Sequence, residues 1–96
     1  MAEPRFDELI HAPHRLRICA MLSQAQGIEF GEILLRIELS KSALSKHLAQ
    51  LVEAGYVAES SIVRSGYSRQ LLALTPAGRA AYAGHRAALP GLMEEG

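Results

Sequence analysis

Small polar and cationic side chains gather on one side of a predicted helix over residues 40–54. Its serines are short enough to allow a close approach to base edges, the amide of Gln50 can pair with adenine, and Lys46 can reach guanine or a phosphate. Lys41 stands at the helix start, where its charge opposes the helix dipole, so a phosphate beside it would relieve the conflict. This surface is therefore suited to contact DNA. The predicted DNA-contacting residues of the helix are Ser40, Lys41, Ser42, Ser45, Lys46 and Gln50.

The opposite side of the same helix is apolar, with a leucine every three or four residues from Leu44 to Leu51. An apolar stripe with this spacing packs a helix against a core. Ser40 is a favourable N-cap and Gly55 a favourable C-terminal stop, so the local sequence marks both ends. We expect the core to hold one face of this helix while the other face stays accessible.

Two more basic residues lie in a β-hairpin predicted after this helix. Two extended runs surround a turn that contains Gly66, and the tip of the hairpin, the wing, covers about residues 62–70. Arg64 and Arg69 flank the turn. They are predicted to contact the DNA backbone or the minor groove next to the helix.

Proline, glycine and apolar spacing divide the rest of the chain into helices. Pro13 is suited to open a helix, Thr75–Pro76 supplies an N-cap followed by a first helical residue, and Pro90 is expected to break or kink the last helix. The order of helices, hairpin and final helix predicts a mainly α-helical α+β fold, the winged helix-turn-helix, as a single domain over residues 1–96. The expected helices cover about residues 6–12, 13–27, 30–37, 40–54 and 76–89.

Three segments resemble, in order, the signatures of winged-helix transcriptional regulators. Arg15–Ile18 resembles their first core helix, Leu39–Val57 contains the runs ALSKHL and EAGYV, and Leu74–Arg79 resembles the segment after the wing. Over about residues 5–89 the chain is most similar to the small MarR/ArsR-like regulators. The resemblance implies a dimeric, sequence-specific DNA-binding transcriptional regulator, with repression as the expected activity. It also implies that helix 40–54 enters the major groove.

The last predicted helix, residues 76–89, is rich in alanine and poor in charge. Left alone it would expose apolar area, which a second copy of the chain would cover. Tyr82, His85 and Leu89 are expected to protrude along one line of this helix. They are the predicted interface residues of a homodimer.

The chain has no net formal charge, yet residues 39–93 hold six basic residues against two acidic ones. This basic second half favours double-stranded DNA as the partner. The neutral total and a wing with only two arginines favour the alternative, a winged-helix protein–protein interaction module without direct DNA binding. Affinity for duplex DNA that falls as salt rises separates the two hypotheses.

The remaining reactive side chains form no catalytic or metal-binding pattern. Cys19 lies on the apolar side of its helix and has no second cysteine to pair with. No nucleophile stands beside a base, so we expect neither an enzyme nor a cofactor. The histidines are scattered, without the spacing of metal ligands on one helix face, at His11, His14, His47 and His85.

The N-terminal residues are acidic and polar rather than those of a secretory signal, and the apolar runs are too short and too often interrupted by charges to span a membrane. A cytoplasmic protein without a membrane partner is expected. No feature of the sequence identifies a small-molecule effector. An effector would have to bind at the dimer interface or between helix and wing.

Overall fold

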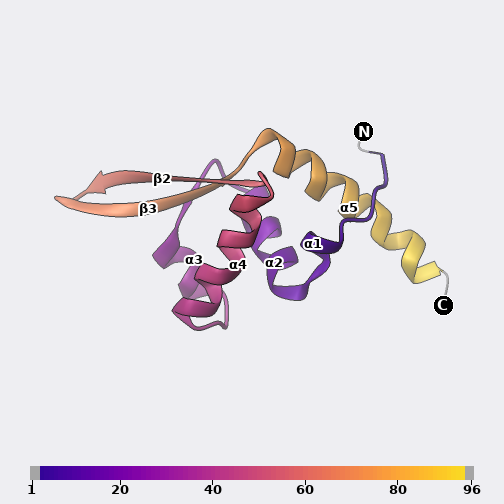
Figure 1. The fold of residues 1–96 in the computed structure, drawn as a ribbon, viewed down its shortest axis with the longest axis horizontal. Helices are drawn as coiled ribbons and strands as arrows, with labels where there is room; N and C mark the ends of the chain where they lie inside the picture. The colour runs from indigo at the N-terminus through magenta and orange to yellow at the C-terminus, as the bar shows by residue number, and fades with distance from the viewer. Residues whose placement is uncertain (1–2, 95–96) are drawn as a thin grey trace.

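The computed structural model describes residues 3–94, so residues 1–2 and 95–96 of the predicted domain lie outside it. The predicted class, mainly α-helical with a β-hairpin, is confirmed (Figure 1). In chain order the elements are α1 (Glu8–His11), α2 (Pro13–Ser23), β1 (Ile28–Glu29), α3 (Phe30–Arg36), α4 (Lys41–Glu53), β2 (Val57–Arg64), β3 (Tyr67–Leu74) and α5 (Pro76–Glu94).

Helices α2, α3 and α4 surround the core, the β2–β3 hairpin extends to one side, and α5 extends to the other (Figure 1). The predicted leucine stripe of α4 is buried in this core. The long axis of the molecule measures 51 Å, because the hairpin and α5 project in opposite directions. The apolar side chains without exposed surface are Ile10, Ile18, Cys19, Leu22, Ile33, Leu44, Leu51 and Leu72.

Capping residues fix the ends of α4 and the start of α5 as the sequence predicts. Ser40 Oγ accepts a hydrogen bond from the Ala43 backbone N–H at 3.1 Å, which satisfies an otherwise unpaired donor. Gly55 has a φ of +81°, the left-handed conformation that ends many helices. Thr75 Oγ1 accepts from the Gly78 N–H at 2.9 Å and caps α5 in the same way.

The hairpin is part of a three-stranded antiparallel sheet with the order β1-β3-β2. Sequence analysis missed β1, whose Ile28 and Glu29 pair with Leu72 and Leu71. A strand of two residues has no periodicity to detect, and its partners lie more than forty residues away. The prediction that the second helix reaches Gly27 was wrong, since α2 ends at Ser23 and the chain then turns toward the sheet.

The wing is longer than the predicted range of 62–70, because β2 and β3 pair along their full lengths. The inner part of β2 is exposed rather than alternately buried, so it carries no period-two pattern of apolar residues. Ser65 and Gly66 both have positive φ, +55° and +81°. Two such residues form the type I′ turn, whose twist matches that of the strands it joins.

Pro90 was expected to break or kink the last helix, and it does not break it, since α5 continues to Glu94. Proline has a φ compatible with a helix and removes one N–H donor, which leaves the carbonyl of Arg86 without its usual partner. Arg86 is exposed, where water can satisfy that carbonyl. Among residues 3–94, no helix combines the length and apolar character needed to cross a bilayer.

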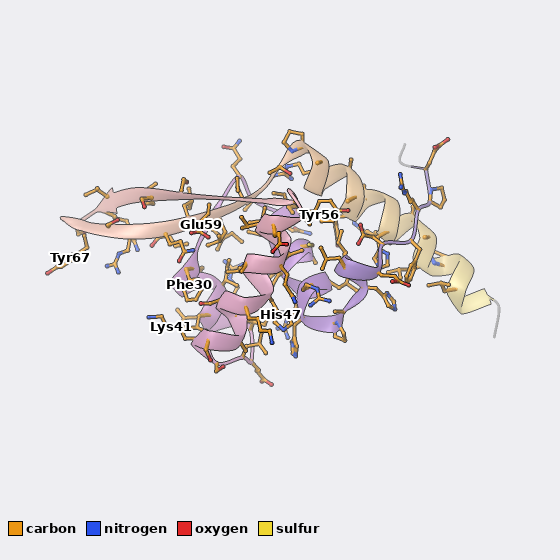
Figure 2. All side chains as sticks on the ribbon, viewed as in Figure 1. Phe30, Lys41, His47, Tyr56, Glu59 and Tyr67 are labelled. Carbon is orange, nitrogen blue, oxygen red and sulfur yellow. The ribbon has the colours of Figure 1, made fainter. Side chains whose placement is uncertain are left out.

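Tyr56 joins three parts of the fold. Its carbonyl accepts a hydrogen bond from the Thr75 N–H at 3.0 Å, and α5 approaches the same carbonyl so closely that a Cβ at Gly78 would overlap it. Its hydroxyl donates to Asp7 Oδ2 at 2.6 Å. The end of α4, the start of α5 and the N-terminal segment therefore meet at one residue (Figure 2).

Candidate nucleic-acid interface

The polar residues predicted on helix 40–54 lie together on the exposed face of α4. The side chains of Lys41, Ser42, Ser45, Lys46 and Gln50 are all exposed. Lys41 projects at the end of α4 nearest the α3–α4 connection (Figure 2). Ser40 is exposed as well, but its hydroxyl is already used for the cap and lies 3.3 Å from Ser42 Oγ. The structure thus brings five of the six predicted residues together with side chains available to a ligand.

Gln50 is held by a residue that sequence analysis did not select, Arg15 in the first turn of α2. Arg15 Nη1 donates to Gln50 Oε1 at 2.7 Å and to His47 Nδ1 at 3.2 Å. Arg15 Nε donates to the Leu9 carbonyl at 2.5 Å. No local signal relates Arg15 to α4, because its partners there lie 32 and 35 residues along the chain.

His47 and His14 extend this contact between α2 and α4, with ring centroids 5.6 Å apart. Burial lowers the pKa of His47 from 6.5, and the positive charge of Arg15 lowers it further, with smaller effects from His14 and Lys46. A lowered pKa favours the neutral ring at pH 7. Only the neutral ring can accept the Arg15 hydrogen bond at Nδ1, so geometry and electrostatics agree.

The two wing arginines have different surroundings. Arg64 Nη2 lies 2.8 Å from Glu29 Oε1 in β1, an ion pair that ties this arginine back to the sheet. Arg69 lies over the ring of Tyr67, with its guanidinium carbon 5.8 Å from the ring centroid. Tyr67 is 68% exposed at the far end of the hairpin (Figure 2). Arg69 is therefore better placed than Arg64 to offer its charge to DNA.

His85 does not protrude with Tyr82 and Leu89, and this part of the predicted dimer interface is corrected. Its side chain is fully buried under the N-terminal segment, where Nδ1 accepts from the Asp7 N–H at 2.9 Å and Nε2 lies 3.1 Å from His11 Nδ1. The spacing of residues along α5 correctly indicates that His85 lies on one line with Tyr82 and Leu89. It cannot indicate that the N-terminal segment covers His85.

The N-terminal segment crosses α5 (Figure 1). The Arg5 N–H donates to the Gly84 carbonyl at 2.9 Å, and the ring of Phe6 packs against both His11 and His85. Tyr82 is half-buried against the core of its own chain, whereas Leu89 is half-buried near the outer part of α5. Of the three predicted interface residues, Tyr82 and Leu89 still present surface to a partner.

Cys19 is fully buried, and burial raises the pKa of its thiol to about 12. At neutral pH it is therefore a protonated, apolar core residue rather than a reactive thiolate. The scattered histidines come together as two pairs, His11 with His85 and His14 with His47. Within residues 3–94 no three histidine, cysteine or acidic side chains group as metal ligands would.

Known proteins share this arrangement. The winged helix DNA-binding domain family matches residues 14–93. A transcriptional regulator homologue from Pyrococcus horikoshii OT3 has the same fold, with a TM-score of 0.85 and 19% identity over 93% of this chain and 88% of that one. HlyU from Vibrio cholerae N16961 is 30% identical over 83% of this chain and 84% of that one, with a TM-score of 0.65.

A candidate MarR-family transcriptional regulator from Enterococcus faecalis V583 has a TM-score of 0.75 and 23% identity, over 91% of this chain and 77% of that one. No curated protein sequence matches the chain significantly. The family match spans α2 to α5, which includes the exposed face of α4 and the wing. The chain therefore belongs to the winged helix DNA-binding domain family.

Proposed function

We propose that α4 enters the major groove of DNA and that the wing lies on the adjacent backbone or minor groove. The observation that carries this proposal is the exposed face of α4, where two lysines, two serines and a glutamine lie together. The buried leucines fix which face of α4 is presented. A single α-helix fits the width of the major groove, and these side chains suit base edges and phosphates.

We further propose that the regulator acts as a homodimer that represses transcription. Leu89 and Leu92 near the end of α5 leave apolar surface uncovered, Leu92 being 50% exposed, and a second copy would bury it. Two copies would read two half-sites related by a two-fold axis. A DNA-binding dimer can repress by occupying a promoter, whereas activation requires a further surface for the polymerase.

The placement of α4 predicts the effect of reversing its charges. The double substitution Lys41→Glu and Lys46→Glu should weaken binding to duplex DNA at least about a hundredfold, because two phosphate or base contacts become repulsive. Titration by fluorescence anisotropy at two salt concentrations measures this loss. Arg86→Glu, a charge reversal on the exposed side of α5, is the control and should leave the affinity within about threefold.

Wild-type affinity that does not change with salt, or an unaffected double variant, would remove α4 from the interface. That result would favour the alternative, a winged-helix protein–protein interaction module. Selection of bound sequences from random duplexes then gives the preferred site. Transcription in vitro from a promoter overlapping that site should fall when the protein is added, and a rise would contradict repression.

A further inference from the structure

Arg15 contacts two other groups besides Gln50, and these hold its guanidinium in place. Its Nε donates to the Leu9 carbonyl, and its Nη1 donates to both His47 and Gln50. These contacts use three of the five N–H donors of the guanidinium, including both on Nη1. Arg15 is half-buried at the junction of α2 and α4, so its orientation is fixed by both helices.

The chemistry of this contact fixes the orientation of the Gln50 amide. A guanidinium has donors only, so the amide atom that faces Arg15 at 2.7 Å must be the oxygen. One lone pair of the amide oxygen is thereby used and the oxygen is turned toward Arg15 in α2, so the NH₂ group, on the other branch of the amide, points away from Arg15. Gln50 itself is exposed, on the same face as Lys46 and Ser42.

This orientation bears on which base Gln50 can read. Pairing with adenine needs both ends of the amide, since the oxygen accepts from adenine N6 while the NH₂ donates to N7. Guanine offers two acceptors, O6 and N7, at the same edge and needs donors only. We infer that Arg15 is a positioning residue that makes Gln50 a donor-only reader of the major groove, which selects guanine over adenine at one base pair.

This inference rests on the proposed placement of α4, and it differs from the expectation that Gln50 pairs with adenine. Arg15 is not itself the guanine reader here. The two-pronged arginine–guanine contact needs two adjacent nitrogens, and the contacts to Leu9, His47 and Gln50 already occupy Nε and Nη1. Arg15 therefore acts by orienting Gln50. It determines which base is preferred, in addition to contributing a positive charge.

The test compares base preferences of four proteins by selection from random duplexes: the wild type, Gln50→Ala, Arg15→Ala and Arg17→Ala. Gln50→Ala identifies the contacted base pair, because preference is lost there and kept elsewhere. At that base pair the wild type should prefer guanine over adenine about tenfold. In Arg15→Ala the amide is free to pair at both ends, so adenine should be bound at least as well as guanine.

Arg17→Ala is the matched control. It removes the same charge from the same helix, but Arg17 Nη2 donates to the Arg36 carbonyl instead of contacting α4. Its guanine preference should equal that of the wild type. A purely structural role of Arg15 would lower affinity for all sequences alike and leave the preference at this base pair unchanged.

A measurement on the wild type keeps the inference testable even if Arg15→Ala fails to fold. Replacing the contacted guanine with 7-deazaguanine removes an acceptor without changing base pairing. Wild-type affinity should fall about fivefold or more, whereas Gln50→Ala should bind both duplexes equally. An unchanged wild-type affinity, or an Arg15→Ala protein that still prefers guanine, overturns the inference and leaves the proposed function intact. A wild type without any sequence preference overturns the proposed function itself.

Discussion

The imidazole of His85 is held between Asp7 and His11, and the contact with Asp7 determines which ring nitrogen carries the proton. Nδ1 accepts the Asp7 N–H, so the proton of the neutral ring is on Nε2, which faces His11. Burial, followed by the charge of His11, lowers the pKa of His85 from 6.5, and the carboxylate of Asp7 opposes this only in part. The unfolded chain therefore takes up this proton more readily than the folded one.

Stability should accordingly fall as the pH is lowered from 7 to 5. The folded pKa lies below the unfolded value, so the loss begins near pH 6.5 and continues down to the folded pKa, at no more than about 1.4 kcal/mol per pH unit for one group. Thermal melts across this range measure the loss. His85→Asn keeps an acceptor for the Asp7 N–H but does not titrate, so its slope should be flatter. An equal slope in both proteins would assign the pH dependence elsewhere, His47 being the next candidate.

Gly78 and Gly31 differ in how much space a Cβ atom would have. Gly78→Ala should destabilise the protein by about 2–4 kcal/mol, because its Cβ would overlap the Tyr56 carbonyl and one of two backbone segments must move. A Cβ at Gly31 in α3 meets nothing within 4 Å, so Gly31→Ala should be neutral or stabilising by up to about 1 kcal/mol. Denaturant midpoints measure both effects. Similar midpoints for the two variants would show that the α5 contact is loosely packed.

Among the elements, α4 was predictable because its determinants are local. Ser40, the leucine stripe and Gly55 lie within sixteen residues, and each acts through its own turn of helix. β1 was not predictable, because two residues become a strand only when β3 lies beside them. The candidate site divides in the same way. Gln50 could be selected from its type and helical face, whereas Arg15 reaches it only through tertiary packing.

The wing leads to a prediction about charge. Glu29→Gln should release Arg64 from its ion pair, which tightens DNA binding and steepens the dependence of log affinity on log salt by up to about 0.9, the value for one added phosphate contact. Arg69→Ala should flatten the same slope by about 0.9, and Arg64→Ala should change it less.

Glu59→Gln is the control for this prediction, because it removes the same charge from an exposed position on β2 without freeing Arg64. Salt titrations of binding compare the variants. Equal slopes for Glu29→Gln and Glu59→Gln would mean that the ion pair does not restrain Arg64.

For the whole molecule, the proposed dimer predicts that stability depends on protein concentration. The melting temperature should rise with concentration, because association stabilises the folded chain. Leu89→Glu should yield monomers with much weaker DNA binding, since it places a carboxylate in an apolar contact of both copies. Leu35→Glu is the control, because Leu35 is 84% exposed on α3, away from α5, and should leave the dimer intact. Sedimentation of the wild type as a monomer at tens of micromolar would contradict dimerisation through α5.

The junction at Tyr56 has a mechanical consequence for such a dimer. Backbone of the α4–β2 connection is hydrogen-bonded to the residue before α5, α5 packs against it at Gly78, and the Tyr56 hydroxyl holds the N-terminal segment to the same point. These contacts couple α5 tightly to the C-terminal end of α4. In two copies joined through α5, each α4 would therefore move as a rigid body with the α5 of its own chain. A small change in the angle at which the two α5 helices cross would change the distance between the two copies of α4. The crossing angle would therefore set the spacing of the half-sites that the dimer can bind.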